Sequence, residues 1–157
     1  MKCKTKGNEG NIALKLDVSK AFDTVKWSYL QAVLENMGFS NIWISWIMQC
    51  VSSVNYHALV NNDRVGPNTP LCGLRQGDPL FPYLYIICSE GLSSYNKYHE
   101  NISLIHITRI CRGSPSITHL LFADDSFLFC KATISEVTTL KNILDTYETA
   151  SSQAINY

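Results

Sequence analysis

Two adjacent aspartates, Asp124 and Asp125, lie between two short apolar runs and constrain the fold more than any other feature of the sequence. The runs Ser116–Phe122 and Ser126–Cys130 have the length and the leucine and phenylalanine content of β-strands. Only a tight turn fits between them, so we expect a hairpin with both carboxylates at its tip. Like charges this close repel each other, and solvent, a basic partner or a divalent cation can relieve the repulsion. Taken alone, aspartates in a turn are also ordinary turn chemistry.

A third carboxylate, Asp17, ends the apolar run Ile12–Asp17, which we predict as a strand. If this strand pairs beside the Asp124–Asp125 hairpin, three carboxylates converge at one end of a sheet. Hard oxygen ligands of that number suit Mg²⁺, which takes one or two carboxylates together with substrate phosphates. Two such ions would activate an attacking hydroxyl and stabilise a leaving oxygen in phosphoryl transfer.

Helical periodicity accounts for much of the first half of the chain. Apolar residues recur every three or four positions from Trp27 to Met37, and Gly38 supplies the stop. Ser40 suits the N-cap of a second helix. The expected inward face of that helix comprises Trp43, Trp46, Ile47, Cys50 and Val54. We therefore expect all three tryptophans of the chain in the core.

Strands, a loop and two longer helices follow. Tyr56–Val60 and the residues after Asn61-Asn62-Asp63 predict a small hairpin with Asn and Asp in its turn, and Gly66–Pro82 predicts a loop. We also expect an apolar helix from the end of that loop through about Tyr95, and a strand over Ile102–Ile110. A last helix should begin at the capping box Thr133–Glu136. Its apolar face comprises Val137, Leu140, Leu144 and Tyr147. This order predicts an α+β fold in which helices pack on one face of an antiparallel sheet.

Composition narrows the class of protein. With 157 residues, 46% of them hydrophobic and 17% charged, the chain suits one folded domain and not a disordered polypeptide. Thirteen basic residues balance thirteen acidic ones, so charge gives no argument for a dedicated duplex binder. The six cysteines form no zinc pattern with the four histidines, and we expect reduced, mostly buried thiols. Without an apolar run of about 20 residues or a secretory signal, we expect an intracellular protein of the nucleus or cytoplasm, not secreted and with no membrane partner.

Three blocks of the chain resemble, in order and spacing, motifs A, B and C of the reverse transcriptases of non-LTR (LINE-type) retrotransposons of the kind common in plants. They are Leu14–Asp23, Gly73–Leu80 and Phe122–Asp125, and the resemblance extends over nearly the whole chain from about residue 10. It implies a polymerase palm, an RRM-like antiparallel sheet with helices on one face. The implied activity is RNA-directed DNA polymerisation, in which two Mg²⁺ ions assist attack of a DNA primer on deoxynucleoside triphosphates along an RNA template.

The resemblance also implies a set of metal ligands. Asp17 and Asp124 match the two ligating aspartates, and Asp125 completes the catalytic acidic triad. The carbonyl of Val18 matches a further ligand of the metal.

Substrate-binding positions follow from the same resemblance. Phe22 matches the aromatic residue that crowds the sugar 2′ position and favours deoxynucleotides, although a core phenylalanine is the alternative. Gln76 and Gly77 match a loop that contacts the template and the incoming nucleotide, although Gly-Asp-Pro is also an ordinary way to begin a helix. Arg75 either reaches a phosphate or pairs with Asp78. We expect Asp23 and Asp78 to act as caps or partners and not as metal ligands.

Departures from the family pattern matter as well. Phe81 precedes Pro82 where the family usually has serine, and its ring either disturbs motif B or buries itself. The chain begins just before motif A and stops before the expected motif D lysine. We therefore expect residues 1–157 to form a single partial domain with incomplete fingers and no thumb. A longer parent protein would supply the missing segments, if they are supplied at all. We expect the isolated chain to be inactive or nearly so.

Three other interpretations stay open. A non-catalytic RNA-binding module of RRM type would show exposed aromatic residues on central strands and bind RNA without Mg²⁺. A decayed retroelement remnant would keep the motifs without activity. A metal-dependent nuclease would also use clustered aspartates, but it leaves the motif B block unexplained.

Overall fold

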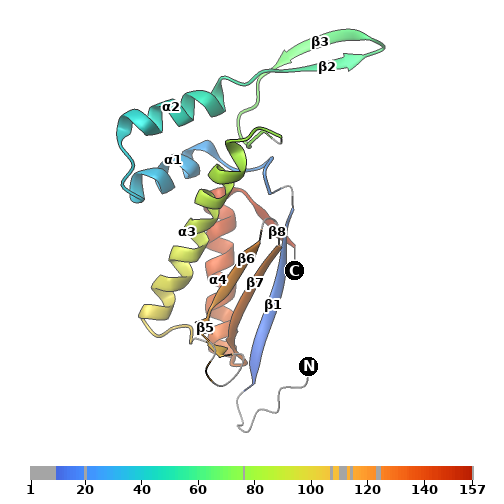
Figure 1. The fold of residues 1–157 in the computed structure, drawn as a ribbon. Helices are drawn as coiled ribbons and strands as arrows, with labels where there is room; N and C mark the ends of the chain where they lie inside the picture. The colour runs from blue at the N-terminus through green and yellow to red at the C-terminus, as the bar shows by residue number, and fades with distance from the viewer. Residues whose placement is uncertain are drawn as a thin grey trace.

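The computed structural model describes residues 10–19, 21–75, 77–106, 108–109, 113, 115–122 and 125–156. The helices are α1 (Trp27–Asn36), α2 (Asn41–Ser52), α3 (Phe81–Asn101) and α4 (Ile134–Ser151). The strands are β1 (Asn11–Ser19), β2 (Tyr56–Val60), β3 (Asp63–Asn68), β4 (Thr108–Arg109), β5 (Ser116–Ile117), β6 (His119–Phe122), β7 (Asp125–Lys131) and β8 (Ala154–Asn156). The expected α+β class with an antiparallel sheet is confirmed (Figure 1).

The main sheet has four strands in the order β6-β7-β1-β8, and every neighbouring pair is antiparallel. Strand β1 lies at the centre because β7 pairs along most of its length, from Asn11 opposite Lys131 to Asp17 opposite Asp125. Strand β8 pairs only with the end of β1, from Asp17 to Ser19. The sheet thus brings the first strand beside the hairpin of β6 and β7, as the sequence predicts.

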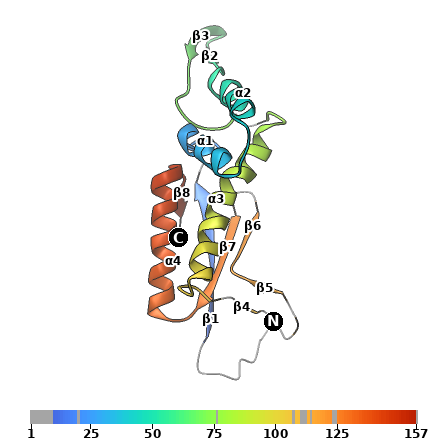
Figure 2. The same ribbon diagram turned by 90° about the vertical axis from the view of Figure 1, so that its left-hand side faces the viewer.

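Helices cover one face of this sheet and leave the other open (Figures 1 and 2). Alternate residues of the central strands, such as Leu16 on β1 and Leu128 on β7, are buried beneath α3 and α4. Their neighbours Lys15, Asp17 and Phe127 point to the open face and are exposed. This alternation follows from the period of two in a strand, and it places the acidic residues on the face without helices.

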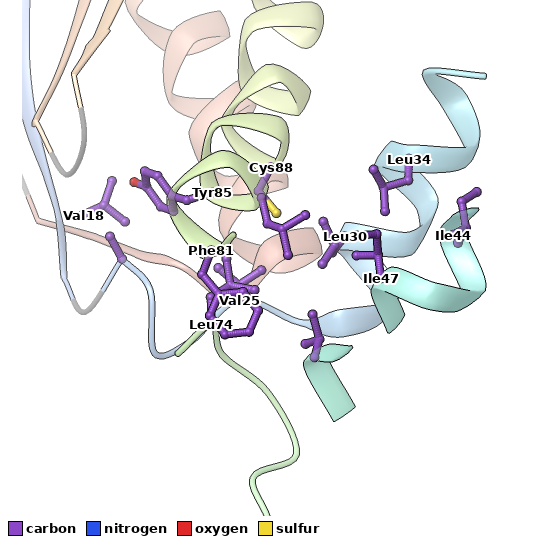
Figure 3. Packing of buried hydrophobic residues seen from close by; sticks show 13 residues of the cluster. Val18, Val25, Leu30, Leu34, Ile44, Ile47, Leu74, Phe81, Tyr85 and Cys88 are labelled. Carbon is purple, nitrogen blue, oxygen red and sulfur yellow. The ribbon is translucent and has the colours of Figure 1, made fainter. Parts of the chain in front are cut away.

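A second apolar cluster joins α1, α2 and the start of α3 to the end of β1. Figure 3 shows Val25, Leu74 and Phe81 at its centre, between Tyr85 of α3 and the paired helices. Burial of each such side chain contributes about 1.5–3 kcal/mol. Phe81 is 3% exposed, so the ring that departs from the family pattern buries itself in this core.

Several predicted element boundaries hold and others do not. Ser40 is the N-cap of α2, where its hydroxyl accepts from the Trp43 amide at 3.3 Å. The hairpin of β2 and β3 turns at Asn61 and Asn62, both with positive φ. The loop expected over Gly66–Pro82 is shorter in the structure, because its first residues belong to β3.

The strand expected over Ile102–Ile110 is wrong for most of its length. Residues 102–105 form turns after α3, and only β4, Thr108–Arg109, is extended among the described residues of that range. The chain reverses there because Ser103 and Leu104 donate to carbonyls of the last helical turn, at Glu100 and His99. Alternation of apolar residues cannot anticipate such capping bonds.

The inward face expected for α2 is also wrong in part. Ile44, Ile47 and Val51 are buried, whereas Trp46 is 61% exposed and Cys50 lies at the surface. The buried stripe is rotated from the one expected, because the helix packs against α1 along the Ile44–Val51 line.

The four described cysteines divide evenly between core and surface. Cys88 and Cys130 are buried, as expected, and burial raises the pKa of the Cys88 thiol to about 12. Cys50 and Cys72 are exposed, so the expectation of mostly buried thiols is wrong for them. Cys3 and Cys111 lie outside the described residues.

Hairpin β2–β3 projects away from the rest of the molecule (Figure 1), and all of its residues are exposed. Within the described part of the chain, no helix is both long and apolar enough to cross a membrane.

Candidate functional site

Asp17 and Asp125 lie directly opposite each other on the neighbouring strands β1 and β7. Residues paired in this way share a face of the sheet, with Cβ atoms about 4.5–5.5 Å apart. The same register continues to Phe122 on β6 and Asn156 on β8, so one row crosses the whole sheet. Asp124 falls outside the described residues. The structure therefore brings together the two predicted acids that it describes, more than a hundred positions apart in sequence.

Lys15 belongs to this acidic end of the open face. Its Nζ lies 2.9 Å from Oδ1 of Asp125, and the two side chains are 58% and 43% exposed. Lys15 and Asp17 are two positions apart on β1, so they point to the same side of the strand. Lys15 carries no sequence signal of this contact, because the contact depends on the register between β1 and β7.

The chemistry of Asp17 and Asp125 fits a hard divalent cation. Both are carboxylates on one open face, and oxygen donors are the ligands that Mg²⁺ takes in proteins. Among the residues that the structure describes, no group of three His, Cys, Asp or Glu side chains forms a metal-binding cluster. The described donors are thus a pair. The backbone of Val18, the other ligand expected, pairs opposite Ile155, and its side chain is buried on the helix-facing side.

The loop before α3 is fixed to the segment that follows β1 by backbone hydrogen bonds. The Gly73 amide donates to the Val25 carbonyl at 2.8 Å, and the Leu74 amide donates to the Phe22 carbonyl at 2.7 Å. Trp27 adds a bond from its indole N–H to the Gly73 carbonyl at 2.8 Å. The motif B block is thereby held against the end of the motif A block.

Phe22 and the residues of the motif B block occupy different environments. Phe22 is half-buried, with its ring centroid 4.5 Å from that of Tyr85 on α3. Arg75 is exposed and, within the described residues, pairs with no carboxylate, so the proposed pair with Asp78 does not form. Gly77 is exposed with φ +87°, and Gln76 lies outside the described residues.

Asp78 accepts two backbone hydrogen bonds in the turn just before α3. Its Oδ1 accepts from the Leu80 amide at 2.9 Å, and its carbonyl accepts from the Phe81 amide at 3.3 Å. The N-cap residue of α3 is Leu80, which has no side-chain cap bond, so Asp78 is a partner of the backbone before the helix and not its cap.

Large apolar side chains adjoin the carboxylates on the open face. Phe122 is 81% exposed, and Leu120 and Phe127, which pair across β6 and β7, are 51% and 37% exposed. Three exposed apolar side chains thus share the open face of the sheet with the two carboxylates.

Strand β8 completes the site and was not predicted. Gln153, just before it, is fully buried and donates from Nε2 to the Ala21 carbonyl at 2.7 Å, while its Oε1 accepts from the Tyr147 hydroxyl. This side chain ties the end of α4 to the segment that follows β1. A buried glutamine has no periodic signal in the sequence, so only the tertiary structure reveals its role.

Comparison with known proteins places this geometry in a family context. A family model described as reverse transcriptase (RNA-dependent DNA polymerase) matches residues 1–155. An uncharacterized mitochondrial protein of Arabidopsis thaliana is 46% identical over 68 residues, which cover 43% of this chain and 56% of that protein.

Two retrovirus-related Pol polyproteins from the type-1 retrotransposable element R2 of Popillia japonica are also similar. One is 31% identical over 137 residues, covering 83% of this chain and 18% of the polyprotein. The other is 29% identical over 124 residues, covering 78% and 19%. The chain thus spans just over half of the plant protein and under a fifth of each polyprotein.

Proposed function

This chain belongs to the reverse transcriptase (RNA-dependent DNA polymerase) family, and we propose that it carries the two-metal catalytic centre of an RNA-directed DNA polymerase of a non-LTR retrotransposon. Asp17, Asp124 and Asp125 hold two Mg²⁺ ions in this proposal, with the Val18 carbonyl as a further ligand. The single observation that carries the proposal is the direct pairing of Asp17 with Asp125 on the open face of the sheet.

The chain's own residues position the reactants. When bound between these carboxylates, Mg²⁺ would supply Lewis-acid chemistry toward the primer hydroxyl and the leaving oxygen. The carboxylates of Asp17, Asp124 and Asp125, which we call the acidic row, fix the position of the metal charge. The Gly73–Leu80 loop is held by the bonds of Gly73 and Leu74 to Val25 and Phe22. In this proposal its residues Arg75, Gln76 and Gly77 contact the template and the incoming nucleotide. Such positioning and charge stabilisation supply most of the catalysis in phosphoryl transfer.

Phe22 acts as the sugar discriminator in this proposal. Its ring packs on Tyr85 at 4.5 Å, which fixes its rotamer against α3. A rigid aromatic wall can exclude a 2′-hydroxyl, whereas a mobile side chain would yield to it. The same contact makes Phe22 part of the core, so both of its expected roles are compatible.

We also propose that the 157 residues alone synthesise DNA weakly or not at all. Each R2 polyprotein extends far beyond the part that this chain matches. Clamping of the triphosphate and of the duplex is therefore assigned to other parts of a longer protein.

The test is cation binding with matched aspartate variants. Calorimetric titration of the chain with Mn²⁺, a probe for Mg²⁺ sites, should give binding that Asp17→Asn and Asp125→Asn each weaken at least roughly tenfold, since each removes a charged ligand. Asp145→Asn, at an exposed position on α4, is the matched control and should bind as the wild type does. Equal affinity in all four proteins would contradict the proposal, and vigorous primer extension by the wild-type chain would contradict its last part.

A second function has one observation in its favour. Phe127 on the central strand β7 and Phe122 on β6 are exposed, as an RNA-binding sheet of RRM type requires. Binding of single-stranded RNA in the presence of EDTA, lost in Phe127→Ala but kept in Asp17→Asn, would favour this non-catalytic function. RNA binding that depends on Mg²⁺ and on Asp17 would favour the polymerase.

A further inference from the structure

We propose that Lys15 is a built-in counter-ion of the acidic row: its ammonium group holds the Asp125 carboxylate while no divalent cation is bound, and an incoming cation has to displace it. This inference rests on the proposed function, because it concerns how the same carboxylates take up a cation. It assigns Lys15 a positioning role, not a catalytic one.

The geometry of the open face carries the first step. Nζ of Lys15 lies 2.9 Å from Oδ1 of Asp125, which is contact distance for a charge-assisted hydrogen bond. Lys15 of β1 lies opposite Phe127 of β7, so its side chain reaches diagonally to Asp125, two residues away on β7. From the same strand and the same face, Asp17 stands directly opposite Asp125. The ammonium group and a cation shared by the two aspartates therefore compete for one carboxylate.

Electrostatics gives the reason for this arrangement. Two carboxylates on facing strands repel each other, and like charges directly opposite destabilise a sheet. The single charge of Lys15 offsets part of that repulsion. A divalent ion supplies twice the charge at the same place, and it repels the ammonium group in turn. Since both side chains are about half exposed, the flexible lysine stem can turn into solvent when the ion arrives.

The matched control lies elsewhere on the surface. Lys97 and Glu90 on α3 form an ion pair with Nζ 3.4 Å from Oε1, and their side chains are 57% and 44% exposed. This pair has nearly the same exposure as Lys15 and Asp125 but no second carboxylate on a facing strand. Lys97→Met therefore reproduces the charge and shape change of Lys15→Met away from the site.

The experiment measures Mn²⁺ binding by calorimetry in the full chain, with Lys15→Met, Lys15→Gln, Lys15→Arg and Lys97→Met variants. Removing one positive charge near a divalent ion should lower the dissociation constant roughly tenfold in Lys15→Met and Lys15→Gln. Lys15→Arg and Lys97→Met should keep the wild-type value. Thermal unfolding in EDTA adds a metal-free measurement: the neutral Lys15 variants should unfold at a lower temperature than wild type, and Mn²⁺ should raise their midpoint more.

Each outcome separates the two proposals. If wild type binds Mn²⁺, Asp17→Asn does not, and the neutral Lys15 variants bind no more tightly than wild type, the counter-ion role is wrong and the metal site stands. If neither wild type nor Lys15→Met binds more tightly than Asp17→Asn, there is no shared cation site and both proposals are wrong. Lys15→Gln keeps the test decisive if Lys15→Met fails to fold.

Discussion

Gly73 lies so close to Asp23 that a Cβ atom added at Gly73 would be 2.5 Å from the Asp23 carbonyl oxygen. The two residues belong to different sequence blocks, one at the end of motif A and one at the start of motif B. Their contact is backbone against backbone, and hydrogen bonds from Gly73 to Val25 and from Leu74 to Phe22 flank it. A side chain at position 73 would therefore push the loop away from the segment that follows β1.

Gly73→Ala should destabilise the protein by roughly 2–4 kcal/mol, because it adds a clash with backbone to the strain of a positive φ of +89°. Gly77→Ala is the matched control: φ is +87°, but nothing lies within 4 Å of the added Cβ. It should cost only the backbone strain, about 1–2 kcal/mol. Urea unfolding of both variants measures the difference, and equal losses would contradict the close approach.

Gly91→Ala tests the packing of α1 on α3. The added Cβ would clash with the Tyr29 hydroxyl oxygen, and that hydroxyl donates to the Cys88 carbonyl at 2.9 Å. The ring has to move and lose its bond, so we expect a loss of roughly 1–3 kcal/mol. In a Tyr29→Phe background the loss should shrink, because the clashing oxygen is gone. Additive effects in this double-mutant cycle would contradict the contact.

Local signals in the sequence predicted much of this fold, since they act between near neighbours. Ser40 caps α2, and Asn61 and Asn62 turn the hairpin, because their preferences need no distant partner. The exposure of Trp46 escaped prediction for the opposite reason. Periodicity gives the angle between side chains on a helix, but it does not reveal which stripe a neighbouring helix covers.

The same division applies to the site. The meeting of Asp17 with the hairpin followed from the family resemblance and not from the strands alone, because apolar alternation does not say which strands pair. The ion pair of Lys15 with Asp125 could not be predicted, because it depends on the exact register of β1 and β7. A one-residue slip would turn Lys15 to the helix-facing side.

Acid should weaken the junction between α4 and the end of α3 through Glu136. Burial raises the pKa of Glu136. Hydrogen bonds from the Lys131 amide and from the His106 amide and ring lower this pKa by more than burial raises it, so the pKa lies below its usual value of 4.5. A carboxyl group whose pKa is depressed in the folded state stabilises the fold at any pH above its pKa in the unfolded chain. This stabilisation disappears as the pH falls through the pKa of the folded state.

The measurement is the free energy of unfolding between pH 7 and pH 3 for wild type and Glu136→Gln. The variant should be less stable at pH 7 and should lose less stability on acidification below about pH 4.5. Glu35→Gln, at an exposed position of α1, is the control and should follow wild type. Parallel curves for wild type and Glu136→Gln would contradict this role.

The buried amide of Gln153 should be essential for placing β8 beside Asp17. Its Nε2 donates to the Ala21 carbonyl at 2.7 Å, its Oε1 accepts from Tyr147, and its backbone amide donates to the Ser151 hydroxyl at 3.1 Å. Gln153→Leu keeps the volume but leaves the Ala21 carbonyl and the Tyr147 hydroxyl unpaired in the core. We expect a loss of roughly 2–4 kcal/mol, about the cost of two unsatisfied buried groups.

The consequence for the site distinguishes this role from general stability. Within the described residues, Val18 and Ser19 pair with β8 alone, whereas Asp17 also pairs with β7, so detaching Gln153 should release Val18 and Ser19 before the rest of the sheet. Amide hydrogen exchange should rise at Val18 or Ser19, whichever amide bonds to β8, in Gln153→Leu, while the amides of Ile12–Leu16 that bond to β7 stay protected. Gln49→Leu on the surface of α2 should change neither. Uniform loss of protection along β1 would mean that Gln153 supports the whole sheet and not the acidic end of it.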